Sequence, residues 1–299
     1  MKNLYVAIAA LVLSPVALAE QSVDKRVQAD PQGEVQVSTV SGLVSIDAWD
    51  RDEVQVTGTL GDDVERLDVE TDRERRHTLI KVVAKKSSGR RHGDDVDAEL
   101  SIRVPAGSRL DINTVSADVS VNGIRGEQRL QTVSGEISSD IAAEDVEAKT
   151  VSGSVVLRGE SKPAVVTVTT VSGDAQVLRA AGEIAANSVS GTLNLEVDQI
   201  TRARARTTSG DLQITGALKK DARVDAETIS GEINLDLKGT VNAEFEIESF
   251  SGEIANCFGQ TAKATHKYGP GNELNFKQGD GSARVRVQSL SGDIRVCGR

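Results

Sequence analysis

Aromatic residues are scarce in this chain of 299 residues: they make up 2% of it, with a single Trp, two Tyr and four Phe. Aromatic rings supply much of the buried area in ordinary globular cores, so a thick core of the usual kind is excluded. Val, Ala, Ser, Thr and Gly are plentiful instead. We therefore expect a thin interior that is filled by small and β-branched side chains.

Histidine and cysteine are also rare. The chain has three His residues (His77, His92 and His266) and two Cys residues, with no HxxxH or CxxC spacing, which argues against a transition-metal site. A catalytic Ser needs a positioned base, and no His with an acid partner lies near the recurrent Ser residues described below. The sequence therefore indicates no catalytic residue, no metal ligand and no cofactor, and it does not predict an enzyme.

Long apolar runs are absent apart from one near the N-terminus. Residues 4–13 form that run, between Lys2 and the small-residue sequence Ala17-Leu18-Ala19, which is the layout of a secretory signal peptide. We assign residues 1–19 to this peptide. After its cleavage we expect no transmembrane segment, because a membrane helix needs roughly 20 apolar residues. The mature protein is predicted to be exported and periplasmic, with an extracellular location as the alternative.

Positive charge is outweighed by negative charge, since 35 Lys and Arg stand against 45 Asp and Glu and give a net charge of -10. Nucleic acids and anionic membranes bind through cationic surfaces, so neither is an expected partner. A short basic cluster, Arg90-Arg91-His92, is closely followed by Asp94-Asp95. We interpret it as part of a solvated loop and not as a phosphate site.

What the chain does contain is a short phrase that recurs, centred on a Ser-Gly pair. The pairs are Ser41-Gly42, Ser134-Gly135, Ser152-Gly153, Ser172-Gly173, Ser190-Gly191, Ser209-Gly210, Ser230-Gly231, Ser251-Gly252 and Ser291-Gly292, with Ser116-Ala117 in the same phase. From Ser116 to Ser251 the steps are 18 to 21 residues, and Pro270-Gly271 lies near the middle of the last step of 40. A repeat of this period is typical of a solenoid. We interpret Pro270-Gly271 as a degenerate copy.

Side-chain parity predicts what each copy forms. Before the Ser, small or apolar residues take alternate positions, as at Val224, Ala226 and Thr228, and after the Gly the alternation changes phase, as at Ile233 and Leu235. Such alternation indicates strands with one buried face. The change of phase indicates a corner, where Gly tolerates backbone angles that other residues avoid. The Ser-Gly pairs are thus predicted to be the structural corners of stacked coils.

The predicted fold is all-β: a single-stranded β-solenoid, similar to a β-helix, of about ten coils of 18–21 residues. The Thr or Ser two places before each corner should form an internal hydroxyl ladder. Residues 49–109 break the repeat and are interpreted as a non-repeating β cap at the N-terminal end, because terminal coils must hide their unpaired edges. We divide the chain into the signal peptide (1–19), an N-terminal β region with the first coil and the cap (20–109), and the solenoid repeat domain (110–299).

An acid stands two places after most of the corner Ser residues. These acids are Asp118, Glu136, Asp174, Asp211, Glu232, Glu253 and Asp293. In a stack they would form a column of like charges, which is unfavourable unless cations or solvent screen it. A solvated face that blocks sideways aggregation is the interpretation we favour, with a strip that binds divalent cations as the alternative.

An apolar residue stands immediately before the Ser in nearly every copy. The set is Val40, Val115, Val133, Val151, Val171, Val189, Ile229, Phe250 and Leu290, with Thr208 as the exception. Strand parity points these side chains outward. Either the corner turns them back inside, or another sheet covers them, or they form an exposed stripe of the kind that marks an interface. From Val133 onward, the apolar members of this set are our candidate interface residues.

Cys257 and Cys297 each lie six residues past a corner Ser. Two cysteines in an exported chain are expected to be oxidised together. With a coil at Pro270-Gly271 between them, their Cα atoms would be about 9.6 Å apart, beyond the roughly 7 Å that a disulfide allows. We still predict a disulfide that closes the C-terminal end, for which the intervening segment must loop out or the last coil must bend inward.

The segments VPAGSRLDINTVSADVSV, LQTVSGEI and SLSGDIRV resemble a bacterial β-strand-repeat family of unknown function with TVSG-type repeats, known as the "putative adhesin" family. The resemblance covers nearly the whole mature chain. It implies a β-solenoid of exported, envelope-associated proteins and carries over no catalytic residues. We expect a non-enzymatic, adhesin-like binding or scaffolding module of the cell envelope, with an envelope protein or a glycan as partner. The alternative is a polysaccharide-acting β-helix enzyme, whose groove would use charges such as Arg202, Arg204, Arg206 and Asp211.

Overall fold

The computed structural model describes residues 21–74, 76–85, 97–142, 144–265 and 270–298. The predicted signal peptide, the basic cluster Arg90-Arg91-His92 and His266 lie outside these residues. The described part of the chain is all-β, and no helix long and apolar enough to cross a membrane occurs in it. Its strands are β1 (Gln21–Gln28), β2 (Glu34–Ser38), β3 (Ser41–Trp49), β4 (Glu53–Leu60), β5 (Val64–Asp72), β6 (His77–Ala84), β7 (Asp97–Pro105), β8 (Arg109–Asn113), β9 (Asp118–Asn122), β10 (Gln128–Gln131), β11 (Ile137–Ile141), β12 (Val146–Lys149), β13 (Val155–Gly159), β14 (Pro163–Thr169), β15 (Ala175–Asn187), β16 (Leu193–Ser209), β17 (Leu212–Ser230), β18 (Ile233–Leu237), β19 (Ala243–Ser249), β20 (Ile254–Asn256), β21 (Lys263–Ala264), β22 (Asn272–Gln278), β23 (Ala283–Ser291) and β24 (Ile294–Gly298).

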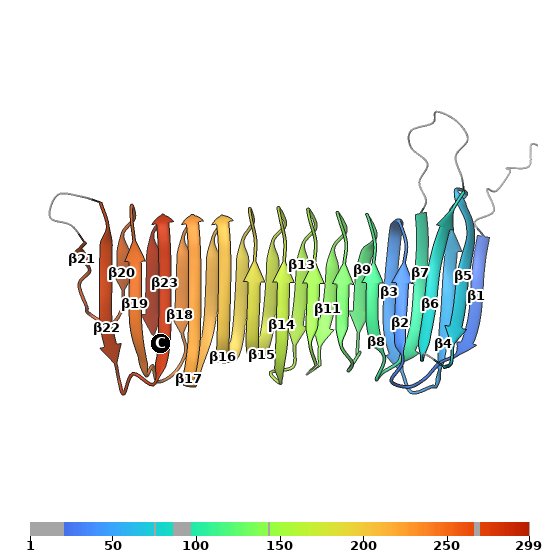
Figure 1. Ribbon diagram of the computed structural model, residues 1–299, viewed down its shortest axis with the longest axis horizontal. Helices are drawn as coiled ribbons and strands as arrows, with labels where there is room; N and C mark the ends of the chain where they lie inside the picture. Colours follow the sequence, from blue (N-terminus) through green and yellow to red (C-terminus); the bar gives the residue numbers. More distant parts are fainter. Residues whose placement is uncertain (1–20, 75, 86–96, 143, 266–269, 299) are drawn as a thin grey trace, which may run out of the picture.

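These strands form two facing layers of one elongated rod (Figure 1). Face 1 holds the strands before the corners, in the order β5, β6, β2, β8, β10, β12, β14, the C-terminal halves of β15, β16 and β17, β23, β19 and β22. Face 2 holds the strands after the corners, in the order β1, β4, β7, β3, β9, β11, β13, the N-terminal halves of β15, β16 and β17, β18, β24 and β20. Most neighbours are parallel and in register, so each coil lies directly on the next. The prediction of an all-β, solenoid-like fold is confirmed.

The core is the thin layer between the two faces. On face 1, Ile112 lies in register between Val37 and Leu130, and on face 2 Val119 lies in register with Ile137. Each of these side chains is at most 2% exposed. Full burial of one aliphatic side chain contributes about 1.5–3 kcal/mol. Because such residues recur at every level, the core needs no aromatic ring along most of its length.

The corner glycines are needed for close stacking more than for their backbone angles. Among them, all of which the structure describes, only Gly42, Gly191 and Gly231 have a φ in the left-handed region, at 106°, 155° and 142°. At every corner glycine, however, an added Cβ atom would collide with the neighbouring coil; at Gly173 it would lie 1.8 Å from the carbonyl oxygen of Gly153. Our interpretation that the glycines serve unusual backbone angles is therefore wrong for most corners. The carbonyl group of the adjacent coil excludes the side chain.

The substitution Gly173→Ala is expected to lower the free energy of unfolding by about 3 kcal/mol, because its methyl group meets a backbone oxygen that strand pairing holds in place. Urea denaturation followed by circular dichroism measures the loss. The matched control is Ser172→Ala, which alters an exposed neighbour and should change the free energy by less than about 0.5 kcal/mol. Equal stability of the two variants would show that adjacent corners can separate enough to admit a side chain.

A Thr or Ser residue lies beneath each corner and is buried, as the predicted hydroxyl ladder requires. The predicted set is Thr114, Thr132, Thr150, Thr170, Ser188, Thr207, Thr228, Ser249 and Ser289, and Thr39 takes the same place at the first corner; none is more than 8% exposed. Several of these hydroxyls bond to the corner backbone: Thr132 Oγ1 accepts from the N–H of Gly135 at 3.1 Å, and Thr150 Oγ1 from that of Gly153 at 2.9 Å. Within this set one bond joins two hydroxyls, from Thr170 to Ser188 at 3.0 Å. The hydroxyls thus brace the corners, and a continuous ladder does not form.

Three of these hydroxyls, those of Thr207, Thr228 and Ser289, lie at successive levels and are buried without a hydrogen-bond partner. Burying an unpaired hydroxyl costs about 1–3 kcal/mol. We therefore expect Thr228→Val to raise the free energy of unfolding by about 1 kcal/mol and Thr150→Val to lower it by about 1 kcal/mol, since the second change removes the acceptor of Gly153. Urea unfolding of the two variants measures both effects. A loss of stability in both would contradict the unpaired state of the Thr228 hydroxyl.

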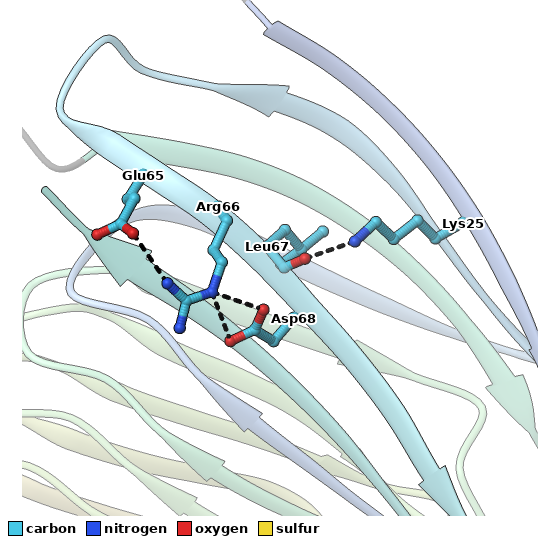
Figure 2. Close-up of polar contacts among 5 residues, drawn as sticks. All are labelled: Lys25, Glu65, Arg66, Leu67 and Asp68. Atoms are coloured by element: carbon cyan, nitrogen blue, oxygen red, sulfur yellow. Dashed lines mark hydrogen bonds and ion pairs between the residues drawn. The ribbon is translucent and has the colours of Figure 1, made fainter.

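At the N-terminal end of the rod, further strands continue both faces (Figure 1). β6 and β5 extend face 1 beyond β2, while β7, β4 and β1 extend face 2 beyond β3. Lys25 of the outermost strand β1 reaches the other face, where its Nζ donates to the carbonyl oxygen of Leu67 on β5 at 2.5 Å (Figure 2). Beside it, Arg66 is held by Glu65 and Asp68, each at 3.0 Å. Charged side chains and an occupied carbonyl make these edges poor templates for an added strand.

The C-terminal end departs from the order of the chain. β23 and β24 come last in the sequence, yet they pair with β17 and β18 on one side and with β19 and β20 on the other (Figure 1). The coil of residues 283–298 is thus inserted before the coil of residues 243–256. The prediction of a degenerate coil at Pro270-Gly271 is wrong. The strand that follows, β22, runs antiparallel to β19 and forms the edge of face 1.

This order brings the two cysteines together. Cys257 and Cys297 form a disulfide with Cα atoms 4.7 Å apart, because their coils are direct neighbours. Both geometries that the sequence left open occur: the intervening segment loops out through β21 and β22, and the last coil takes an inward position. Three Phe residues gather at this end: Phe245 stacks on Phe276 with ring centroids 4.5 Å apart and contacts Phe258 at 5.3 Å. The inserted coil carries the Val and Ile residues of an ordinary inner coil, whereas the aromatic cluster suits a terminus.

Candidate binding groove

The apolar residues before the corner Ser residues are exposed along the whole rod. Their exposed fractions run from 39% at Val40 to 54% at Phe250. In order along the rod, with Thr208 between Val189 and Ile229, they are Val40, Val115, Val133, Val151, Val171, Val189, Ile229, Leu290 and Phe250. Neither the corner nor another sheet covers them, so the exposed stripe is the arrangement present. We call this set the apolar row.

A second outward row runs beside the apolar row on face 1, two residues earlier in each strand. This polar row consists of Asn113, Gln131, Lys149, Thr169, Asn187, Arg206, Glu227, Gln288 and Glu248, joined in this order by strand register. The surface is hollowed at two places along these rows. One hollow of about 320 Å³ includes Gln131, Val133, Lys149 and Val151 in its lining, and another of about 720 Å³ lies farther along the same rows. We call these two hollows, together with the two rows that connect them, the corner groove.

The corner groove is largest at its C-terminal end. There β22 adds a side wall, since Glu273 lies in register with Glu248, and the apolar row ends in its bulkiest members, Ile229, Leu290 and Phe250. Leu290 lies between the other two because its coil is the inserted one. All three residues belong to the predicted interface set, but their clustering was not predicted. Repeat spacing does not encode the order in which coils stack.

The acids after the corners lie on the far side of the Ser residues, and their Asp members bind the backbone of the next coil. Asp211 Oδ1 accepts a hydrogen bond from the N–H of Glu232 at 2.9 Å. The same bond joins Asp118 to Glu136, Asp174 to Thr192 and Asp293 to Glu253. These Asp residues therefore have a structural role that the interpretation as a solvated face did not include. Among the described residues, no three His, Cys, Asp or Glu side chains are grouped so as to hold a metal ion.

The substitution Asp211→Ala is expected to lower the free energy of unfolding by about 1 kcal/mol, because the N–H of Glu232 loses its acceptor. Glu232→Ala removes an acid from the same column without breaking such a bond, and it should change the free energy by less than about 0.5 kcal/mol. Thermal unfolding of the two variants at low and at high salt separates the bond from the charge. A gain of stability in both variants would mean that repulsion along the column outweighs the backbone bond.

The corner Ser residues keep their side chains at the surface, while their backbone N–H groups help to join the coils. The N–H of Ser134 donates to the carbonyl oxygen of Val115 at 2.8 Å, and that of Ser190 donates to Val171 at 2.7 Å. The one His in the described part of the chain is His77 on β6, whose Nε2 lies 3.3 Å from Gln36 Oε1. Within those residues, no corner Ser is paired with a His.

The charged residues proposed for an enzymatic groove do not come together. Arg202, Arg204 and Arg206 point outward from face 1 and pair with acids on neighbouring strands. Their partners are Glu183 at 3.9 Å, Asp225 at 3.9 Å and Glu227 at 2.9 Å. Asp211 lies beyond the corner and bonds to the backbone of Glu232 instead. Exposed ion pairs of this kind contribute little to stability, and they leave no free acid and base facing each other.

Both the sequence and the fold resemble those of known proteins. The family model described as Toastrack DUF4097 matches residues 33–297. A "putative lipid binding protein" from Parabacteroides distasonis is 12% identical, with 92% of this chain and 96% of that chain covered and a TM-score of 0.51, which shows a shared fold. A "putative adhesin" from Bacteroides fragilis is 13% identical, with 94% of this chain and 98% of that chain covered and a TM-score of 0.44. No curated protein matches the sequence.

Proposed function

The chain belongs to the Toastrack DUF4097 family, and we propose that it is an exported, non-enzymatic β-solenoid that binds a component of the cell envelope through the corner groove. In this proposal the rod is a stack of about ten coils, capped at the N-terminal end by strands from residues 20–109. It works in the periplasm and is adhesin-like in the sense that its activity is binding. The exposed apolar row is the observation that carries the proposal.

The apolar row is a poor surface to leave in water. Contiguous apolar patches on a protein surface usually mark the place where a partner or ligand binds. With strands about 4.8 Å apart, the row runs for roughly 43 Å along the rod. That length suits an interface of ordinary size, which buries about 800 Å² on each partner.

The side chains that line the corner groove are better suited to binding a partner than to catalysis. The polar row offers amides and hydroxyls, and several of its side chains are bound to one another: Arg206 donates two hydrogen bonds to Glu227, at 2.9 and 3.1 Å, and Gln288 donates to Glu248 at 2.9 Å. Side chains held in this way are placed to recognise a partner. They are not placed to exchange protons with a substrate.

A protein partner fits the groove better than a glycan. Flat aromatic rings combine a large apolar face with a polar edge, which suits them to packing against sugar rings. Within the described residues that line the two hollows, Phe250 is the one aromatic residue. Aliphatic side chains form the rest of the apolar row, as in many protein interfaces.

A photo-crosslinking amino acid placed at Val133, Val189 or Ile229 in the exporting cell tests the proposal. We expect one discrete protein adduct, shared by the three positions and recovered from the periplasmic fraction. The matched control is the same amino acid at Val165, which is 44% exposed but stands outside the apolar row, and which should give no adduct. Equal labelling from Val165, or no adduct from any position, would contradict the groove as the binding surface.

A further inference from the structure

The large C-terminal hollow of the corner groove combines apolar side chains with an excess of negative charge among its described residues. Ile229, Leu290 and Phe250 form its apolar floor, and each is at least 50% exposed. Glu227, Glu248 and Glu273 stand around this floor, with Arg206 as the cation among the described lining residues. The hollow has a volume of about 720 Å³, which is within the range of sites that bind a drug-sized ligand.

Among the described residues of this hollow, acids outnumber cations. Arg206 is bound to Glu227 through two nitrogen atoms, so that pair is neutral. Glu248 accepts only from the neutral amide of Gln288. Glu273 lies opposite Glu248 on one side and opposite Lys263 of β21 on the other. Like charges placed opposite each other across a strand pair are destabilising. Lys263 offsets one of these two carboxylates, and the described residues around the apolar floor still carry a net negative charge.

Further acids flank the same floor on the other side of the corner Ser residues. Asp211, Glu232, Asp293 and Glu253 follow the corners of the four levels that end in Thr208, Ile229, Leu290 and Phe250. The apolar floor thus lies between two acidic borders. A second copy of this chain would set acids against acids, and an anionic lipid surface or a nucleic acid would be repelled in the same way.

We propose that this hollow binds a cationic, apolar polypeptide segment, with a Lys or Arg side chain against Glu248 and Glu273 and a large apolar side chain on Leu290 and Phe250. The inference rests on the proposed function, since it assigns a partner chemistry to one part of the corner groove. The apolar contact supplies most of the affinity, and the two carboxylates make the site selective for a positively charged partner. Partners with acidic flanks are rejected because they would bring more negative charge to an acidic border.

Binding of short fluorescein-labelled peptides to the mature, disulfide-bonded chain tests the inference, with fluorescence anisotropy as the readout. The probe is a peptide of alternating lysine and leucine, and its counterpart has glutamate in place of lysine. We expect the lysine peptide to bind at least tenfold more tightly, with an affinity that falls as salt is added. Both Leu290→Ser and the double variant Glu248→Gln, Glu273→Gln should weaken its binding at least tenfold.

Two control variants test whether binding is local to the hollow. Val165→Ser removes an exposed apolar side chain from face 1 outside the apolar row, and Glu99→Gln removes an exposed acid from β7 near the N-terminal end. Neither should change the affinity. Equal binding of the two peptides, or loss of binding in the controls to the same degree, overturns the inference. A crosslinked adduct at Val133 or Ile229 together with equal peptide binding would retain the groove as the binding surface and reject its preference for cations.

Discussion

The fold depends on one repeated contact, in which the carbonyl group of a corner lies against the glycine of the next coil. At Gly153 and Gly173 an added Cβ atom would lie 1.8 Å from that oxygen, so the backbones approach as closely as they can. This contact sets the distance between coils at the corner. Strand pairing on both faces then continues at the same spacing, which keeps the inward side chains of successive levels in register.

The same contact explains why the apolar row lies at the surface. A side chain just before the corner cannot turn inward, because the space beneath the corner is taken by a Thr or Ser hydroxyl that braces the turn, as Thr150 does for Gly153. The outward direction is therefore fixed at every level by the backbone. What varies is the residue placed there: Val along most of the rod, and Ile229, Leu290 and Phe250 where the groove is largest.

Much of this architecture could be predicted from residue order, and the part that could not has a clear physical reason. Parity separated buried residues such as Val224 and Ala226 from their outward neighbours, and the repeat located the corners and the two cysteines. The order in which the coils stack could not be predicted in this way. Every coil presents nearly the same edge to its neighbour, so local pattern does not say which coil lies beside which. The cluster of Leu290 with Phe250, and with it the best candidate site, depends on that order. The hydrogen bond from Asp211 to the next coil was not predicted either. Side-chain parity predicts whether a side chain points inward or outward, and it does not predict the bonds that a carboxylate makes.

The inserted coil also constrains how the rod is assembled. Coils that stack in the order of the chain can each join an existing end as they appear, so every addition closes only a short loop. Residues 243–256 cannot reach their final neighbours in this way, since those neighbours are residues 283–298. The terminal coil must either wait for the later segment or first pair with residues 222–237 and then be displaced. Growth of the rod is thus sequential through its middle coils and concerted at the C-terminal end, where the two last coils and the disulfide form a single cooperative unit.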